Sequence, residues 1–557
     1  MAAGGTIVQQ PTGASALVDA MLQLDVDVIF GLPGVHNLAV WEAVAETGIR
    51  LVGVRHEQAA VYAADGYARA TGRLGVAVVT TGPGAANTLG ATGEAMASGS
   101  PVLVVATDIP TSLRRDGVYR GVLHETRDQA AMFVPVTKSA GTVCSASDVY
   151  GDVLAAASTA LRPSSGPVYL GIPTDLLSTP VGHDARPSGP KPAEAGLTEA
   201  DLAEALRLIE AADRPLLWAG GGALRADAGE VVGELATRIA APVVTTYGSR
   251  GLLPPDHPCL APGPVHVPPV GRLWDEADLV IAVGSDFDGM MTQNWMMPAP
   301  ATLLTVNVDT DDASKNYRAD HALAGDARDV LTRLLPRVLP RTGLDALRSE
   351  LEAVGRQVHD IVLDEEPQAA QMLDVLDRCV PPSAVITADM CIAGYWLAAF
   401  HRVPGPRRLS YPMGWGTLGY AFPAALGVAT TGASRAIAVV GDGGFLFACG
   451  ELAAVRQERL PLTVVIVDDG GYGMLRYDQV HANVATRGVD LATPDFTLLA
   501  HAFGIEATAV EGFGTSFETT LTEYVRSPEP NVIVVKAAMT PPPSTSPRWY
   551  RRQEERP

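Results

Sequence analysis

The sequence GDGGFLFACGELAAVRQERLPLTVVIVDDGGYGMLR, residues 441–476, decides the fold prediction. The apolar run AIAVV at 436–440 leads into Gly-Asp-Gly, and the apolar run LTVVIV at 462–467 leads into Asp-Asp-Gly-Gly. The stretch between the two runs has apolar residues at helical spacing, namely Leu446, Phe447, Leu452, Ala453 and Val455. Pro461 then restarts the chain before the second run. This order predicts a strand, a helix and a second strand.

The two predicted strands both end on acidic residues. Taken singly, Asp-Gly and Gly-Gly are ordinary turn dipeptides. Continuous Val- and Ile-rich strands, however, indicate a parallel sheet, in which a crossover places Asp442 and Asp469 at the same edge. Neighbouring carboxylates repel unless a cation lies between them, and Mg²⁺ favours carboxylate, phosphate and water oxygens. The glycines beside Asp442 leave backbone N–H groups at a helix start, so the stretch predicts a metal–diphosphate site.

Composition points to a globular protein that binds a small molecule. The 557 residues are 47% hydrophobic and 18% charged, with a net charge of −21 that argues against nucleic acid or an anionic membrane as partner. No Lys or Arg precedes Arg50, and no apolar run approaches the roughly 20 residues of a membrane helix. We therefore expect a cytoplasmic protein. The five cysteines lack metal-site spacing, which favours reduced thiols.

The pattern of the opening stretch occurs a second time near the N-terminus. The sequence VAVVTTGPGAANTLGATGEAMASGSPVLVVATD at 76–108 again has a strand, a glycine turn, a small-residue helix and a strand that ends in Asp108. This match indicates two copies of one α/β domain. The first copy has Pro83 where the second has Asp442, so only the second could hold the metal.

A third α/β segment lies between the two copies. The Pro-rich stretch at 185–196 precedes it, and the polar stretch at 355–367 is expected to close it. Its Gly220-Gly221-Gly222 sequence fits a structural turn better than a dinucleotide-binding loop. The predicted fold class is α/β, with three doubly wound parallel-sheet domains. We expect an N-terminal domain at 1–184, a central domain at 190–345, a C-terminal domain at 360–540 and a mobile or strapping tail at 541–557.

Several sequence segments, taken together, resemble one enzyme family. The Gly-Asp-Gly motif with its downstream acidic pair is similar to the thiamine-diphosphate motif. The segments that resemble the acetolactate synthase branch are FGLPG (30–34), RHEQAAVYAADGYARATG (55–72), TTGPGAANTLG (80–90), PVLVV (101–105), GPVYLGIPTDLL (166–177) and GTLGYAFPAALG (416–427). They cover most of the chain in the order found in that family.

The resemblance implies a pyrimidine-binding domain, a central domain and a diphosphate-binding domain, with each site formed between subunits of a homodimer or dimer of dimers (homotetramer). It implies Mg²⁺ ligands at Asp442, Asp469 and the carbonyl of Gly471, although the family usually has Asn at position 469. The residues expected to contact thiamine diphosphate are Pro33, Asn87, Met390, Ile392, Gly416, Leu418, Asp442, Gly443, Gly444, Asp469, Gly471, Tyr472, Gly473 and Met474.

Glu57 resembles the activating glutamate of the family. Taken alone, a Glu at a helix start usually only offsets the helix dipole. In the family, this carboxylate binds the pyrimidine ring, and the cofactor's own amino group then removes the thiazolium C2 proton. Leu418 stands where the family has the apolar wedge that bends the cofactor, and the Gly416 carbonyl is expected to accept from the amino group.

Two histidines are candidates for polar contact with substrate. His36 follows the sequence LPGV, and His124 stands where acetolactate synthases have a glutamine. Each could equally be a structural residue. Thr80 stands where a benzoylformate-decarboxylase-like enzyme would have its histidine.

Two departures weaken a plain acetolactate synthase assignment. Asp478 stands at the Trp that shapes the acceptor pocket of that enzyme, and an acid there would disfavour a second anionic 2-oxo acid. The sequence DFDGM at 286–290 replaces an arginine-rich segment of the flavin-binding domain. FAD binding is therefore not expected to be tight.

We carry three hypotheses from this resemblance. The first is a thiamine-diphosphate- and Mg²⁺-dependent enzyme that decarboxylates a 2-oxo acid and transfers the resulting acyl carbanion to a carbonyl acceptor. The second is a simple non-oxidative 2-oxo acid decarboxylase. The third is a catalytically silent cofactor-binding relative, which the presence of Glu57, Asp442 and Asp469 together argues against.

Overall fold

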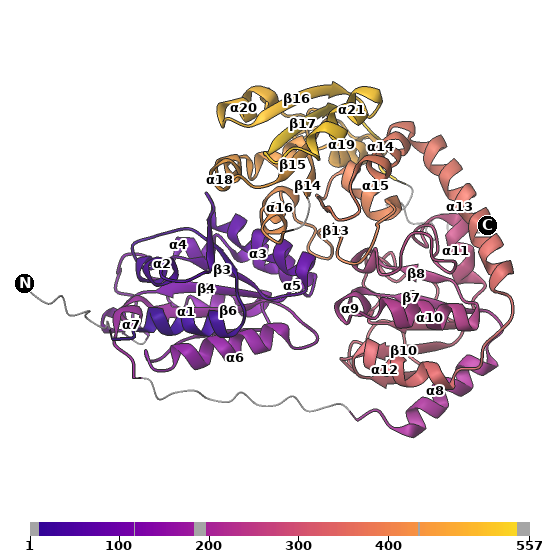
Figure 1. Ribbon diagram of the computed structural model, residues 1–557, viewed down its shortest axis with the longest axis horizontal. Coiled ribbons are helices and arrows are strands. Elements are labelled where there is room, and N and C mark those ends of the chain that lie inside the picture. Colours follow the sequence, from indigo (N-terminus) through magenta and orange to yellow (C-terminus); the bar gives the residue numbers. More distant parts are fainter. Residues whose placement is uncertain (1–9, 116, 183–195, 433–434, 543–557) are drawn as a thin grey trace, which may run out of the picture. The chain divides into compact units, whose positions relative to one another are not determined.

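The computed structural model describes residues 10–115, 117–182, 196–432 and 435–542. Most of the predicted linker at 185–196 and of the predicted tail at 541–557 lies outside the described residues. The chain divides into two compact units, Met1–Pro192 and Ala193–Pro557. Figure 1 shows each unit as sheets covered by helices.

The first unit holds one fully parallel six-stranded sheet in the order β2-β1-β3-β4-β6-β5. Its strands are β1 (Val28–Gly31), β2 (Arg50–Gly53), β3 (Gly75–Val79), β4 (Val102–Asp108), β5 (Ser139–Thr142) and β6 (Val168–Pro173). Every residue of β3, β4 and β6 is buried, as expected for strands covered on both faces.

Helices cover both faces of this sheet (Figure 1). Helix α1 (Gly13–Gln23) packs against α2 (Leu38–Ala45), α6 (Val149–Leu161) and α7 (Thr174–Ser178). Helix α3 (Glu57–Thr71) packs instead against α5 (Leu89–Ala97) and β3. Helix α1 begins at a capping box in which Thr12 and Ser15 satisfy each other's backbone N–H groups.

The second unit contains two further parallel sheets. The first has the order β11-β10-β9-β7-β8. Its strands are β7 (Pro215–Ala219), β8 (Val243–Thr245), β9 (Leu279–Val283), β10 (Leu303–Asn307) and β11 (His321–Ala324). The helices of this part are α8 (Glu199–Ala211), α9 (Gly221–Arg225), α10 (Gly229–Ile239), α11 (Pro268–Asp275) and α12 (Ala327–Leu334).

The other sheet of the second unit has the order β13-β12-β14-β15-β17-β16. Its strands are β12 (Val385–Ala388), β13 (Leu409–Ser410), β14 (Ala436–Gly441), β15 (Leu462–Asp468), β16 (Glu506–Glu511) and β17 (Asn531–Lys536). Its helices include α14 (Pro367–Cys379), α15 (Ile392–Phe400), α16 (Ala421–Ala429), α19 (Gly473–His481), α20 (Phe496–Ala502) and α21 (Thr515–Tyr524).

The first and third sheets share one strand order. Numbered within each sheet, both run 2-1-3-4-6-5, with every pair parallel. This repeat agrees with the two copies inferred from the sequence, and the three parallel sheets confirm the α/β fold class.

The helix expected between β14 and β15 is divided in two. Helix α17 (Asp442–Leu446) ends, a 3₁₀ turn follows at Cys449–Glu451, and α18 (Leu452–Glu458) completes the crossover. The prediction of one apolar face was wrong at Phe447, which is 57% exposed. Phe447 is the C-cap of α17, and its Cβ lies against Gly419, so it leaves the face that Leu452 and Val455 bury.

The polar stretch at 355–367 is not a linker. Residues 355–365 belong to α13 (Leu344–Glu365), a long helix that packs against α11 and α14, and Pro367 already begins α14. Leu347, Leu351, Val354, Val358 and Val362 form its buried stripe. These residues recur every three or four positions, so only one narrow side of the helix is apolar. The stretch is therefore polar on average, and its composition alone did not indicate a helix.

The glycine triplet at 220–222 has a packing role. A Cβ on Gly220 would lie 2.3 Å from the Gly284 carbonyl oxygen, and one on Gly222 would lie 2.8 Å from the Gly284 Cα. The loops after β7 and β9 therefore touch backbone to backbone, which favours the structural-turn interpretation. Among the described residues, no helix is long and apolar enough to cross a membrane.

Candidate functional site

The predicted C-terminal site lies where the strand order of the third sheet reverses. After β12 the next strand, β13, lies on one side, and after β14 the next strand, β15, lies on the opposite side. In open α/β sheets, ligands bind outside the carboxyl ends of the strands at such a point. The loops after β12, β14 and β15 meet there. They enclose a cavity of about 210 Å³.

This cavity brings together every site residue predicted in the second unit. The predicted residues that line it are Met390, Ile392, Gly416, Leu418, Asp442, Gly443, Gly444, Asp469, Gly471, Tyr472, Gly473 and Met474. Further lining residues that were not predicted include Cys391, Tyr395, Leu475, Ala537 and Met539.

Two carboxylates of the cavity have buried oxygens without hydrogen-bond partners. They are Asp442 Oδ2 and Asp469 Oδ1. Gly441 pairs with Val467 across β14 and β15, which places the two strand ends side by side. Burial, followed by repulsion from Asp469 and Asp468, raises the pKa of Asp442 to about 7. Burial also raises the pKa of Asp469. Such a pair fits a divalent cation, which would compensate both charges.

The glycines of the cavity leave no room for side chains. A Cβ on Gly443 would lie 2.6 Å from Tyr472 Cε1, and one on Gly444 would lie 2.4 Å from Asp389 Oδ2. A Cβ on Gly473 would lie 2.0 Å from Asp469 Oδ2. Only glycine therefore fits at these three positions, where the backbone itself lines the cavity and can offer N–H groups to a diphosphate.

Asp389 is a residue of this site that the sequence reasoning missed. Its buried carboxylate accepts hydrogen bonds from the N–H groups of Gly419 (3.0 Å), Tyr420 (3.2 Å) and Met390 (3.0 Å). It thereby fixes the segment that carries Gly416 and Leu418. The available signal was an Asp directly after the short apolar run at 384–388, the same kind of signal that identified Asp442.

The first unit places Glu57 at the first residue of α3, where it is 8% exposed. Asn87 Nδ2 donates to Glu57 Oε2 at 2.9 Å, so two predicted cofactor contacts meet. A Cβ on Gly84 would lie 3.4 Å from Glu57 Oε1, which puts the glycine turn after β3 directly beside the carboxylate.

His36 and His124 also lie together, at the carboxyl edge of the first sheet. Their ring centroids are 5.3 Å apart, and His36 Nδ1 is 2.7 Å from Thr81 Oγ1. His124 has a positive φ of 68° and a buried Nδ1 without a hydrogen-bond partner. Burial, then the charge of His124, lowers the pKa of His36, while Asp108 opposes the shift.

Pro33 and Gln129 complete the first-unit site. Pro33 is exposed in the loop after β1. The Asn37 side chain holds this loop, because its Oδ1 accepts from Gly34 N at 2.7 Å and its Nδ2 donates to Leu32 O at 3.1 Å. Gln129 was not predicted. Its Oε1 accepts from Gly82 N at 2.6 Å and so holds the glycine turn, a contact across many residues that no local pattern indicates.

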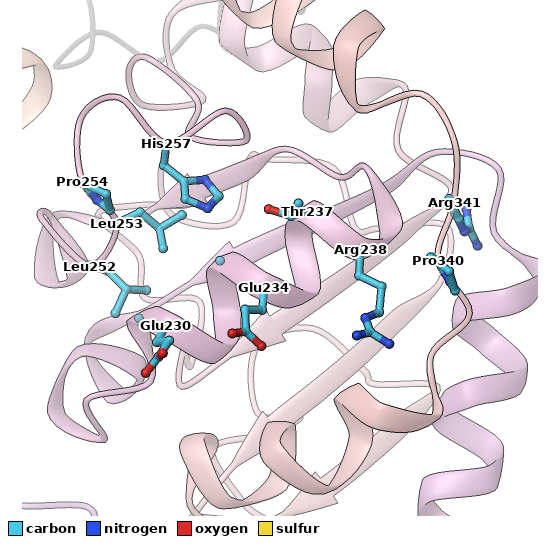
Figure 2. Close-up of a pocket in the computed structure, with 12 residues that line it drawn as sticks. Glu230, Glu234, Thr237, Arg238, Leu252, Leu253, Pro254, His257, Pro340 and Arg341 are labelled. Atoms are coloured by element: carbon cyan, nitrogen blue, oxygen red, sulfur yellow. The ribbon is translucent and has the colours of Figure 1, made fainter.

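A larger cavity, of about 840 Å³, lies along α10 (Figure 2). Glu230, Glu234 and Arg238 lie along this helix, with His257 across from it. Arg238 donates to the Val338 carbonyl, and Arg341 donates to carbonyls at the end of α8. No predicted site residue lines this cavity. Its arginines hold the segment after α12 in place.

The two departures from the acetolactate synthase pattern have clear positions. Asp478 is exposed on α19 and does not line the smaller cavity. In the segment at 286–290, Asp286 forms an ion pair with Lys315 at 2.7 Å. Asp288 accepts from the N–H groups of Met290 and Met291 at 2.8 and 2.9 Å.

Comparisons with known proteins agree with this geometry. Three models of the thiamine pyrophosphate enzyme match the chain in order: the N-terminal TPP binding domain at residues 11–132, the central domain at 202–334 and the C-terminal TPP binding domain at 389–535. A relative from Pseudomonas aeruginosa is 37% identical over 500 residues, which is 88% of each chain. The chain belongs to the thiamine pyrophosphate enzyme family. The Pseudomonas relative is named "Probable 2-ketoarginine decarboxylase AruI".

Other members of the family are acetolactate synthases. The relative from Methanocaldococcus jannaschii, a "Probable acetolactate synthase large subunit", is 31% identical over 89% of this chain and 87% of its own. The "Acetolactate synthase large subunit" of Corynebacterium glutamicum is 31% identical over 90% of this chain and 83% of its own. The expected resemblance is therefore confirmed: this is a thiamine-diphosphate-dependent enzyme of the acetolactate-synthase-like branch.

Proposed function

We propose that this enzyme uses thiamine diphosphate and Mg²⁺ to decarboxylate a 2-oxo acid and to release the corresponding aldehyde. The observation that carries the proposal is the cavity at the ends of β14 and β15. Asp442 and Asp469 each direct a buried, unpartnered oxygen there, beside glycines that a diphosphate can approach. We assign the Mg²⁺ ligands to these carboxylates and to the Gly471 carbonyl.

The residues of the chain act on bound cofactor and substrate in distinct ways. When bound, thiamine diphosphate would supply the nucleophilic carbon and the electron-withdrawing ring that decarboxylation of a 2-oxo acid needs. Glu57, held by Asn87, binds the pyrimidine ring and favours loss of the C2 proton. Gly416 and Leu418 orient the same ring, and Asp389 fixes their loop.

The two histidines favour aldehyde release. His36 and His124 form the polar pair of the first-unit site, and one of them can deliver the proton that ends the reaction. Carboligation, expected from the sequence as the main outcome, is the second candidate. The acetolactate synthases among the relatives support it.

Asp478 supports a substrate with a positively charged end. It lies one helical turn after Met474 and Leu475, which line the cavity, and therefore on the same side of α19. Tyr395 also lines the cavity, and its pKa is raised by burial and then by Cys391, Asp389 and Asp478, in that order. The charge of Asp478 therefore acts on a residue of the cavity. A carboxylate there repels a second 2-oxo acid and attracts a guanidinium or ammonium group. The relative named for 2-ketoarginine agrees with this substrate class.

A substrate screen tests the proposal. Purified protein with thiamine diphosphate and Mg²⁺ is given 2-ketoarginine, pyruvate and 2-oxohexanoate, and CO₂ and products are measured with and without an added aldehyde. We expect CO₂ and aldehyde, with 2-ketoarginine preferred. Asp478→Asn should lower kcat/KM for 2-ketoarginine by roughly 10- to 100-fold, the worth of a charged hydrogen bond, and leave 2-oxohexanoate unchanged. Absence of CO₂ from every 2-oxo acid would overturn the proposal.

A further inference from the structure

Arg476 reaches back from the first turn of α19 onto the loop that carries the proposed metal ligands. Its Nη1 donates to the Asp469 carbonyl at 3.3 Å, and its Nη2 donates to the Gly470 carbonyl at 3.2 Å. Its Nε donates to Asp490 Oδ1 at 2.9 Å. One guanidinium thus joins the 469–471 loop to a segment further along the chain.

The same two segments are also joined through their backbones. Gly471 pairs with Asp490, Tyr472 N donates to Val489 O at 2.8 Å, and Leu491 N donates to Gly470 O at 2.9 Å. Gly471 has a φ of +153°, and a Cβ on it would lie 2.0 Å from the Val489 carbonyl oxygen. The backbone of residues 470–472 is therefore held closely against residues 489–491, and Arg476 adds a side-chain connection between the same two segments.

Arg476 also bears on the charge of the site. Asp469 brings a second negative charge beside Asp442 and next to the expected diphosphate. Arg476 Nη1 lies 4.0 Å from Asp469 Oδ1, with both side chains largely buried (28% and 16% exposed). At this separation and burial, the opposite charge offsets the carboxylate substantially.

We propose that Arg476 is a positioning residue that holds Asp469 and the Gly471 carbonyl toward the metal and balances the charge of Asp469. Together, Asp469 and Arg476 then present an oxygen ligand to the metal with no net charge. This inference rests on the proposed function, because it concerns the same cofactor site. It predicts that the two residues are coupled: Arg476 matters while position 469 is an acid, and matters much less when it is an amide.

A double-mutant cycle on the apoenzyme measures this coupling. The Kd of thiamine diphosphate is determined at fixed Mg²⁺ by calorimetry for the wild type, Arg476→Met, Asp469→Asn and the double variant. Loss of a residue that orients metal ligands typically costs 10- to 100-fold in affinity, so we expect Arg476→Met to weaken binding by roughly tenfold or more. Asp469→Asn should stay within about threefold of the wild type, and the double variant within about threefold of Asp469→Asn.

Three further variants complete the design. Arg476→Lys keeps the charge but cannot span both carbonyls and Asp490, and should weaken binding by an intermediate factor. Asp490→Asn, which loosens the anchor without touching the arginine, should do the same and serves if Arg476→Met fails to fold. Arg459→Met removes an arginine whose side chain is 71% exposed on the same domain, and should leave the Kd unchanged.

The outcomes separate the inference from the proposed function. If the wild type binds no thiamine diphosphate, both are overturned. If the wild type binds it and Arg476→Met and Asp490→Asn bind equally well, only the positioning role is overturned. If Arg476→Met weakens binding and Asp469→Asn does not restore it, the charge-balancing role is overturned.

Discussion

Glu57 is a buried carboxylate with one side-chain hydrogen bond, from Asn87. Glu57→Gln keeps the size of the side chain and removes the charge that favours loss of the C2 proton. We expect thiamine diphosphate still to bind, while exchange of its C2 proton with deuterium slows by roughly 10²- to 10⁴-fold. Quenched-exchange NMR measures this without any substrate. Glu46→Gln, at the exposed end of α2, is the control. If C2-proton exchange in Glu57→Gln is as fast as in the wild type, Glu57 does not activate the cofactor and only offsets the dipole of α3.

Asp442 is the other residue on which the proposal depends. Asp442→Ala removes a carboxylate that we assign to the metal, so the purified variant should contain neither Mg²⁺ nor thiamine diphosphate above background. Metal analysis and cofactor extraction check this. Asp345→Ala changes a carboxylate whose side chain is 96% exposed on α13 and should match the wild type. Full occupancy in Asp442→Ala would refute the metal assignment.

Sequence reasoning succeeded for residues whose role follows from their place along the chain. Asp442 and Asp469 were predicted to be neighbours because each ends a buried strand and parallel crossovers align such ends. Gln129 was missed because its role is a hydrogen bond to Gly82, a partner fixed by the tertiary fold. Leu475, which lines the cavity beside the predicted Met474, was likewise not predicted.

At the level of elements, the loop at 416–420 depends on one buried side chain. Asp389→Ala would remove the buried carboxylate that accepts from the N–H groups of Gly419 and Tyr420, at a cost of roughly 3 kcal/mol. We expect faster hydrogen–deuterium exchange in peptides that cover this loop. Exchange measured by mass spectrometry on the apoenzyme checks this, with Asp374→Ala, an exposed carboxylate of α14, as the control. Equal protection in both variants would contradict the role of Asp389.

The elements were predicted best where apolar runs were continuous. Strands β14 and β15 agree with the runs seen in the sequence, because fully buried strands need no polar face. The crossover between them was predicted less well. It is divided into α17 and α18, and at the break Phe447 lies against Gly419, a glycine outside the segment.

For the whole molecule, the family resemblance implies an oligomer with shared sites. Glu57 belongs to the first unit and Asp442 to the second, and we propose that a functional site takes one from each subunit. Mixing inactive Glu57→Gln with inactive Asp442→Ala should then return about a quarter of wild-type activity, because about half of the dimers are hybrids with one intact site. Subunit exchange is verified by mass spectrometry. Exchange without recovery would contradict the shared site.

Flavin content is a second property of the whole molecule. The segment at 286–290 has Asp286 paired with Lys315 and Asp288 occupied with backbone N–H groups, and it offers no arginine to a flavin phosphate. We therefore expect purified protein without a stoichiometric flavin band in its visible absorption spectrum. A yellow protein with one flavin per chain would show that other residues of the central domain supply the phosphate contacts.

The place of β17 in the third sheet bears on how the protein is made. This strand comes late in the chain, yet it lies between β15 and β16 rather than at an edge. Just beyond it, Ala537 and Met539 line the cofactor cavity, and Thr540 N bonds to Glu366 Oε2 at 2.7 Å. During synthesis on the ribosome, β16 therefore has no neighbour to join until β17 emerges. The first unit can fold while translation continues, but a nascent chain can complete the smaller cavity only after β17 and the residues just beyond it have left the ribosome.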